Sequence, residues 1–178
     1  MDRRVQKSRE AITAALLDLM AERSFDEITV RALAERANVN RGTIYLHYRD
    51  KFDLLEKVIE EHIERLRNLC ESVWDQTFEE ANHVWFDYFA ANHRFFSTML
   101  ATESANYFRV RFRDLVVAEL RREVDVGEEP NRGLTGEVVV QFFASALVGV
   151  VEWWITQGMP IPARTLAEQT GRLLDRNF

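Results

Sequence analysis

One short stretch of the sequence, RGTIYLHYRDK from Arg41 to Lys51, gathers side chains that suit contact with a partner better than burial. Arg41 can donate to a guanine edge or to a phosphate, and hydroxyl and imidazole groups such as those of Thr43 and His47 can donate to phosphate oxygens. Lys51, at the start of a further helix, is expected to anchor a phosphate. The predicted contacts to double-stranded DNA are Thr29, Arg31, Asn40, Arg41, Thr43, Tyr45, His47, Tyr48 and Lys51.

Capping residues and apolar spacing indicate that two helices joined by a short turn carry this stretch. Thr29 can cap a helix over about residues 30–37, because its hydroxyl can accept an N–H of the first turn. Asn38 tolerates a left-handed backbone, and Asn40 can cap a third helix over about residues 41–48. A short second helix that is polar outside is typical of a helix-turn-helix, in which that helix lies in the major groove.

The rest of the sequence predicts an all-α protein. Proline is absent from the first 129 residues, and no segment alternates polar and apolar residues as a half-buried strand does. Apolar residues at three- and four-residue steps and turn signals predict helices over about residues 4–22, 30–37, 41–48, 51–70, 77–92, 93–100, 104–123, 134–157 and 163–176.

Charge is distributed unevenly along the chain. The net charge of −6 argues against nucleic acid at first sight. However, residues 1–51 hold ten Lys and Arg against eight acidic residues, so the excess of acid lies entirely in the remainder. A mildly basic N-terminal segment on an acidic body is compatible with DNA binding by that segment, although such an asymmetry does not establish it.

Composition and spacing argue against several other classes of protein. The single cysteine, Cys70, excludes an intrachain disulfide, and no Cys/His spacing suggests a metal site. The N-terminus lacks a signal-peptide pattern, and the apolar run 138–154 is short for a membrane span and carries Glu152, so it indicates a buried or interfacial helix. No catalytic constellation or phosphate-binding loop appears. We therefore expect a cytoplasmic protein that is not an enzyme and has no cofactor, metal or membrane partner.

The opening stretch resembles the helix-turn-helix of the tetracycline-repressor (TetR) family. That family carries a pattern like T-x-x-x-[IL]-A-x-x-A-G-V-S-x-G-T-[LI]-Y-x-[HY]-F-x-x-K-x-x-L. The sequence departs from it at Asn38, Asn40, Tyr48 and Phe52, and the two asparagines preserve the turn and capping chemistry. The corresponding residues are Thr29, Leu33, Ala34, Ala37, Val39, Gly42, Thr43, Ile44, Tyr45, His47, Tyr48, Lys51 and Leu54.

A second likeness covers the C-terminal region. Residues 142–174 look like the last two helices of a common TetR C-terminal type, in which these helices form the dimer interface. The resemblance thus implies a helix-turn-helix DNA-binding domain over residues 1–51 and a helical ligand-binding and dimerisation domain over residues 52–178. The expected interface residues are Val138, Phe142, Ala146, Val150, Trp154, Leu166 and Leu173.

The resemblance also implies a cavity for a small molecule in the body helices. A mainly apolar pocket with a few directing polar groups, such as Asn82, would suit a hydrophobic or aromatic effector. Aromatic residues at helical spacing are more often ordinary core than a ligand site, so both readings stay open. The candidate pocket residues are Trp85, Phe86, Phe89, Phe96, Met99, Tyr107, Phe108, Phe112, Phe143 and Trp153.

The function that the resemblance implies is ligand-responsive regulation of transcription. We expect a homodimeric repressor that binds a palindromic operator and is released by a small-molecule effector. One alternative is a transcriptional activator of the same fold, and another is a helical protein–protein interaction module that no longer binds DNA. A helical small-molecule enzyme would require a catalytic dyad in the cavity.

Overall fold

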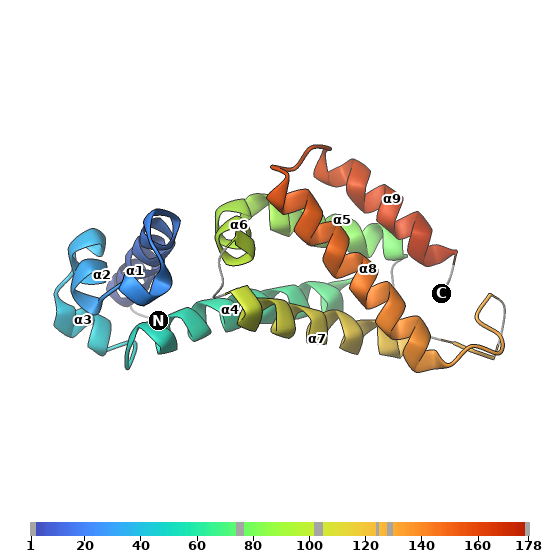
Figure 1. Cartoon of the computed structure of the whole chain (residues 1–178), viewed down its shortest axis with the longest axis horizontal. Coiled ribbons are helices and arrows are strands. Elements are labelled where there is room, and N and C mark those ends of the chain that lie inside the picture. Colours follow the sequence, from blue (N-terminus) through green and yellow to red (C-terminus); the bar gives the residue numbers. More distant parts are fainter. Residues whose placement is uncertain (1–2, 74–76, 102–104, 124, 128–129, 177–178) are drawn as a thin grey trace. The chain divides into compact units, whose positions relative to one another are not determined.

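The regular structure of the described residues is entirely helical (Figure 1). The structure is a computed structural model that describes residues 3–73, 77–101, 105–123, 125–127 and 130–176. In chain order its elements are α1 (Arg3–Glu22), the 3-10 turn η1 (Phe25–Glu27), α2 (Val30–Ala37), α3 (Arg41–Tyr45), α4 (Lys51–Ser72), α5 (Phe78–Ala91), α6 (His93–Ala101), α7 (Ala105–Glu123), α8 (Gly136–Thr156) and α9 (Ala163–Asp175). The all-α prediction is confirmed.

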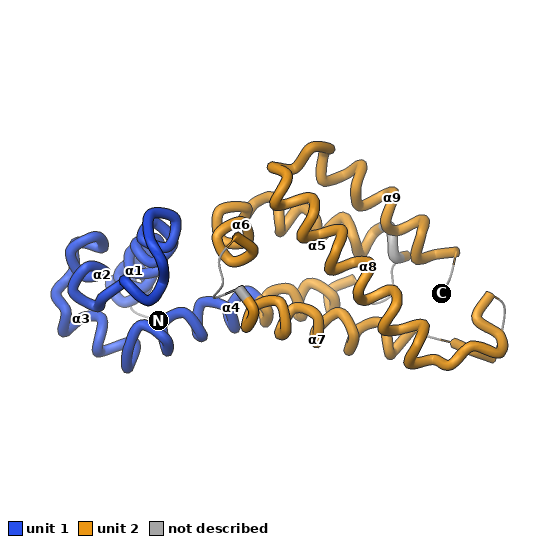
Figure 2. Tube along the Cα trace, viewed as in Figure 1, with its two compact units in different colours: residues 1–62, 102–104 blue, residues 63–101, 105–178 orange. Residues whose placement is uncertain are grey.

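The helices form two compact units (Figure 2). In the described chain, unit 1 comprises residues 3–62 and unit 2 comprises residues 63–101 and 105–176. The division falls inside α4, whereas the boundary expected from the sequence lies at the first turn of the same helix. Helix α4 therefore supplies residues to both units.

Unit 1 is built on the apolar face of α1. Ile12, Leu16 and Leu19 are fully or almost fully buried at three- and four-residue steps, as the spacing predicts. Helix α1 packs on α2, and α2 packs on α3, where Leu33 and Ile44 close the core. Each such side chain contributes about 1.5–3 kcal/mol of burial free energy, which fixes the short α3 although five residues alone could not form a stable helix.

Unit 2 is held together by aromatic packing. Its most extensive helix contacts join α5 to α9 and α7 to α8. The Phe89 ring meets the Phe96 ring edge to face at 4.8 Å, and the Phe108 and Phe112 rings stack with 5.8 Å between centroids. Phe86 packs against Trp154 with centroids 5.6 Å apart. Such offset and edge-to-face pairs stabilise the core beyond the area they bury.

Helix boundaries agree closely with the sequence prediction except at α3. Helix α2 has the predicted bounds, but α3 ends at Tyr45 and not at Tyr48. The N–H groups of His47 and Tyr48 both donate to Ile44 O, at 2.9 Å each, which tightens the chain into a turn. This turn carries Tyr48 into the core of unit 1.

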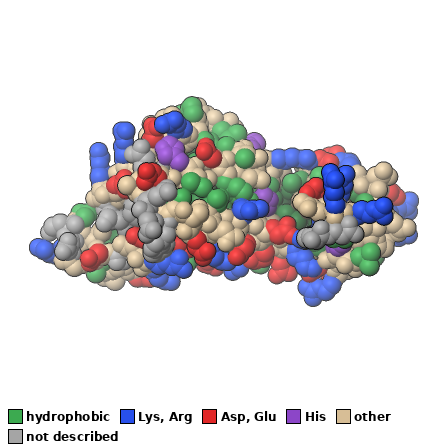
Figure 3. Space-filling model, turned by 180° about the vertical axis from the view of Figure 1, so that it is seen from behind, with side chains coloured by type: hydrophobic (Ala, Val, Ile, Leu, Met, Phe, Trp, Pro, Cys, Tyr) green, Lys and Arg blue, Asp and Glu red, His purple; other side chains and the backbone are tan. Residues whose placement is uncertain are grey.

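Acidic and basic side chains are mixed over the face of the molecule shown in Figure 3. Within unit 2, ion pairs join α7 to α8, for example Arg121 with Glu137 at 2.8 Å and Arg109 with Glu152 at 2.7 Å. These pairs tie neighbouring helices together at the surface, where each is worth about 1 kcal/mol or less.

Candidate nucleic-acid interface and ligand cavity

The turn between α2 and α3 has the geometry that its residues predict. The Ala32 N–H donates to Thr29 Oγ1 at 3.1 Å, which caps α2. Asn38 adopts the left-handed conformation, with φ 52° and ψ 45°, and so ends that helix. Two residues later, Asn40 Oδ1 accepts from the Gly42 N–H at 2.9 Å and caps α3. The chain therefore leaves α2 and begins α3 as a separate short helix within three residues.

The outer face of α3 combines a cation, a phenol and an apolar side chain. Arg41 is exposed, and no described residue forms a hydrogen bond or ion pair with its guanidinium. Tyr45 is 58% exposed, and Thr43 is half-buried. Leu46, which the sequence analysis did not select, is 80% exposed at the end of α3. The exposure of Leu46 could have been predicted, because it lies two residues after the buried Ile44 and therefore points to another side of the helix.

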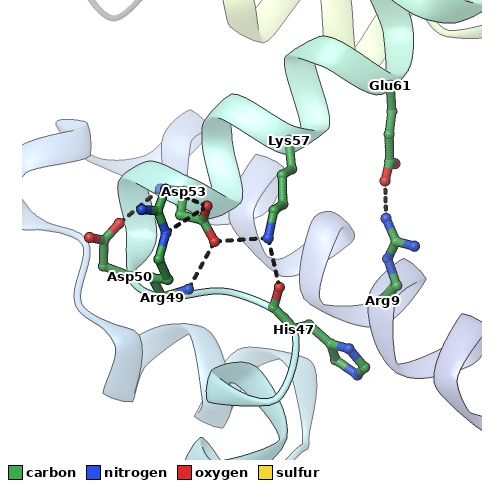
Figure 4. Close-up of polar contacts among 7 residues, drawn as sticks. All are labelled: Arg9, His47, Arg49, Asp50, Asp53, Lys57 and Glu61. Atoms are coloured by element: carbon green, nitrogen blue, oxygen red, sulfur yellow. Dashed lines mark hydrogen bonds and ion pairs between the residues drawn. The ribbon is translucent and has the colours of Figure 1, made fainter.

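A network of polar contacts fixes the junction of α3 and α4 (Figure 4). Asp50 Oδ1 caps α4 by accepting from the Asp53 N–H at 2.8 Å, and Asp53 Oδ2 accepts from the Arg49 N–H at 2.8 Å. Lys57 Nζ donates to Asp53 Oδ2 and to His47 O, at 3.0 Å each. The Arg49 N–H, the Lys57 ammonium and the Arg49 guanidinium hold the pKa of Asp53 at about 2, so this carboxylate stays charged and keeps the junction closed.

Lys51 has a different role from the phosphate anchor expected from the sequence. Its Nζ donates to Phe25 O at 2.9 Å and to Asp26 O at 2.8 Å, and it lies over the Phe25 and Phe52 rings at 4.9 and 5.3 Å from their centroids. Two of its three N–H groups are thus used inside unit 1. Lys51 therefore joins the first turn of α4 to η1 and so helps to hold the helix-turn-helix in place.

Tyr48 also differs from its predicted role, because its side chain is only 3% exposed and cannot donate to a phosphate. It lies near Arg9 of α1, which pairs with Glu61 of α4 (Figure 4). Tyr48 and Glu61 raise the pKa of Arg9, since both interact favourably with its charge. Tyr48 therefore stabilises the interior behind α3, which corrects the prediction that it contacts DNA.

The remaining predicted contacts lie at or near the surface of unit 1. Arg31 is exposed on α2 and pairs with Glu35, with Nε to Oε1 at 2.8 Å, so a phosphate would have to compete with that carboxylate. Thr29 and Asn40 are exposed and serve as helix caps. His47 is half-buried, with its ring 6.1 Å from that of Tyr48. Arg41, Thr43 and Tyr45 thus stay predicted DNA contacts, whereas Tyr48 and Lys51 have partners inside unit 1.

Unit 2 contains a cavity of about 120 Å³ near the C-terminal end of α4. Apart from two glutamates, Asn82 and Cys70, its lining is apolar. Burial raises the pKa of the Cys70 thiol to about 12 and also raises the pKa of Glu119, whose Oε2 lies 3.1 Å from Arg122 Nη1. The described lining residues are Cys70, Val73, Ala81, Asn82, Trp85, Val116, Glu119, Leu120, Glu123, Leu147 and Leu174.

Of the ten residues predicted to line a pocket, only Trp85 is among the described lining of this cavity. Trp153 is 47% exposed on the surface of α8, Tyr107 is exposed on α7, and Phe143 is half-buried against Phe142. The others fill the core against one another, because edge-to-face rings leave no room between them; these are Phe86, Phe89, Phe96, Met99, Phe108 and Phe112. The aromatic cluster is therefore core, and the cavity lies beside it.

One face of α8 carries exposed apolar side chains. Val138 and Phe142 are both more than 60% exposed, Ala146 is exposed on the next turn, and Leu173 of α9 is exposed as well. The predicted interface residue Val150 is half-buried. Helix α8 is the single described helix long and apolar enough to cross a membrane, and this outward face contributes to that property.

Trp154 and Leu166, also predicted at the interface, are buried in the core of unit 2 and are corrected on that point. Trp154 is 1% exposed, and its Nε1 donates to Ile161 O at 2.8 Å. That bond closes the turn between α8 and α9, where Gly158 and Met159 have positive φ values of 72° and 57°. Among the described residues, no group of three or more His, Cys, Asp or Glu could hold a metal ion.

Comparisons with known proteins agree with this architecture. A family model described as the C-terminal region of transcriptional regulators matches residues 74–176, and the model of bacterial regulatory proteins of the tetR family matches residues 12–58. The crystal structure of a TetR transcriptional regulator from Streptococcus agalactiae 2603V is 28% identical in sequence. It superposes with a TM-score of 0.68 over 97% of this chain and 96% of that one.

Curated relatives match only a part of the chain. The uncharacterized HTH-type transcriptional regulator YxbF of Bacillus subtilis (strain 168) is 46% identical over 55 residues, which are 31% of this chain and 14% of the relative. The HTH-type transcriptional repressor BepR of Brucella suis biovar 1 (strain 1330) is 38% identical over 53 residues, which are 30% of this chain and 25% of the relative. The chain thus covers well under half of the length of the curated relatives it matches. With both units matched by models of one family, the chain belongs to the TetR family, whose members are DNA-binding transcriptional regulators and not enzymes.

Proposed function

We propose that the protein is a dimeric, ligand-responsive regulator that binds a palindromic operator through α3. The observation that carries this proposal is the outer face of α3, where the Arg41 guanidinium has no described partner and stands beside the exposed Tyr45. A free guanidinium on a short, rigidly held helix suits bidentate reading of a guanine. Thr43 and Asn40 can add contacts to phosphate or base edges, and Leu46 can meet a thymine methyl.

Dimerisation through α8 and α9 is the second part of the proposal. Val138, Phe142 and Ala146 form an apolar stripe along α8, and Leu173 extends it onto α9. A contiguous exposed apolar stripe marks an interaction surface. Pairing of two copies across this stripe supplies two α3 helices, so two half-sites about 34–36 Å apart would be read together.

We propose that the protein represses transcription and that it acts in the cytoplasm. BepR, which is 38% identical to this chain over 53 residues, is a transcriptional repressor. A regulator that occupies an operator blocks transcription unless it also recruits the transcription machinery. Activation by the same DNA-bound dimer is the alternative, and a reporter gene placed behind the operator distinguishes the two by the sign of its response.

Helix α4 offers the route by which an effector could act. Its first turn closes the helix-turn-helix through Lys51 and Asp53, and its last turns line the cavity through Cys70 and Val73. An effector that binds one arrangement of α4 better than another shifts the population between them by its differential affinity. The effector and the operator would then change each other's affinity by the same factor.

Selection from a library of random DNA duplexes, at two salt concentrations, tests the proposal. We expect an enriched palindrome, with affinity that falls steeply as salt rises because counterions are released. Arg41→Ala should relax the preference at one base position in each half-site and cost about 1–3 kcal/mol of discrimination there. Tyr45→Ala should weaken binding, while Arg94→Ala, an exposed arginine on α6, serves as the matched control. Absence of any enriched sequence at low salt would favour the protein-interaction module instead.

A further inference from the structure

The cavity of unit 2 has room for one small molecule. Its volume of about 120 Å³ is close to that of a cavity of about 150 Å³ that holds benzene in another protein. Val73, Val116 and Leu174 line it with apolar surface, and Trp85 adds a ring against which a flat molecule can pack. A single ring or a short branched chain therefore matches its size and its walls.

Asn82 is the unusual member of this lining. The residue is 8% exposed, and its Nδ2 is shielded from water without an acceptor among the described residues. Buried amide donors are nearly always paired, because an unpaired one loses its hydrogen bonds to water and gains nothing in return. The terminal torsion of an asparagine side chain is soft, so a small rotation can bring its N–H groups toward a molecule in the cavity.

Glu119 supplies a hydrogen-bond acceptor in the same cavity, which complements the Asn82 donor. It lines the same cavity from α7, and its carboxylate can only accept hydrogen bonds when it is charged. Oε2 is engaged by Arg122, with Oε2 to Nη1 at 3.1 Å, so its charge is already compensated. A ligand atom that both accepts from Asn82 and donates to Glu119 satisfies both residues, and a hydroxyl oxygen does this.

The polar groups of the cavity favour a neutral ligand over an ion of either sign. Two glutamates and no lysine or arginine are among its described lining residues, so a carboxylate ligand would be repelled. An ammonium group has no lone pair to offer to Asn82 Nδ2, so it would leave that buried donor unpaired even where it pairs with a glutamate. A neutral ligand therefore matches the polar groups of the cavity best.

We propose that this cavity binds a small neutral alcohol or phenol, whose hydroxyl pairs with Asn82 and Glu119 and whose apolar part packs on Trp85. This inference rests on the proposed function, since it names the chemical class of the effector. It also assigns the polar recognition to two residues on α5 and α7, away from the aromatic core.

Four probes of similar shape test the proposal by calorimetry or by protein-detected NMR: benzyl alcohol, ethylbenzene, benzylamine and benzoate. We expect the full-length protein to bind benzyl alcohol about tenfold more tightly than ethylbenzene, because one hydrogen-bonded hydroxyl is worth about that factor. The two charged probes should bind more weakly than the alcohol. Asn82→Leu, which fills a similar volume, should reduce the preference for the alcohol by about tenfold, while Asn68→Leu on the exposed face of α4 should leave it unchanged.

Operator binding by the same preparations distinguishes failure of the cavity inference from failure of the proposed function. If the variants bind operator as the unsubstituted protein does and benzyl alcohol loses its preference only in Asn82→Leu, the inference stands. Equal selectivity in both proteins, tighter binding of either ion, or no binding of any probe by operator-competent protein would overturn it. Loss of operator recognition in the unsubstituted protein would instead contradict the proposed function.

Discussion

Replacing Lys51 by methionine separates a structural role from a phosphate contact. Methionine keeps an unbranched apolar stem and removes only the ammonium, with its two bonds to Phe25 O and Asp26 O and its contacts with the Phe25 and Phe52 rings. A hydrogen bond to a charged group is worth about 1.5–3 kcal/mol, and a cation–π contact at a half-exposed site adds about 0.5–1 kcal/mol. The freed carbonyls can turn to water, so we expect a net loss of about 2 kcal/mol in the free energy of unfolding.

Thermal and urea unfolding measure this loss. For a chain of this length, 2 kcal/mol corresponds to a fall of about 4–8 °C in the melting temperature. Operator affinity, measured well below that temperature as a function of salt, should keep its slope, because no phosphate contact is removed. Lys7→Met, an exposed lysine on α1, is the control for stability. Unchanged stability with a salt slope reduced by about one would refute this reasoning and restore Lys51 as a phosphate anchor.

Three further predictions concern the turn, the α4 junction and the α8 stripe. Asn38→Val should lower the free energy of unfolding by about 1–2 kcal/mol, and Asn38→Gly should not, because a β-branched residue resists φ 52°; urea unfolding compares them. The pKa of Asp53 is lowered to about 2 in the folded protein, so its contribution is complete above its unfolded pKa of about 3.9 and is lost as pH falls toward 2. Asp53→Asn should abolish that part of the acid dependence in unfolding experiments between these pH values. Phe142→Glu should yield a folded monomer in sedimentation experiments because it places a charge in the proposed interface, whereas Glu168→Gln on α9 should remain dimeric; a stable Phe142→Glu dimer would place the interface elsewhere.

Local signals in the sequence were sufficient to predict the helix-turn-helix. Caps and turn conformations depend on residues a few positions apart, so Thr29, Asn38 and Asn40 could be assigned from their types alone. Tyr48 and Lys51 were misjudged because a polar tip can be satisfied inside the fold by groups far away in the chain. The Phe25 carbonyl, 26 residues before Lys51, is such a partner.

The helical spacing of aromatic residues in unit 2 predicted that they are buried, but it did not predict which of them line a cavity. Whether a ring lines a cavity depends on how its neighbours pack, which is a tertiary property, and the cluster around Phe89 and Phe108 closes on itself. Trp153 and Trp154 illustrate the same limit. Adjacent residues on a helix point about 100° apart, so one tryptophan is exposed and the next is core. Helix α8 has few polar residues, so its sequence gives little indication of which face is buried.

The central claim is that two copies of α3 read two half-sites in one assembly. Its most direct test is the affinity for the selected operator after about five base pairs are inserted between its half-sites, which places them on opposite faces of the duplex. If two copies of α3 read the two half-sites, the affinity should fall to the non-specific level after the insertion. Substitutions of the spacer sequence at constant length should have little effect. Unchanged affinity after the insertion would contradict dimeric reading of a palindrome.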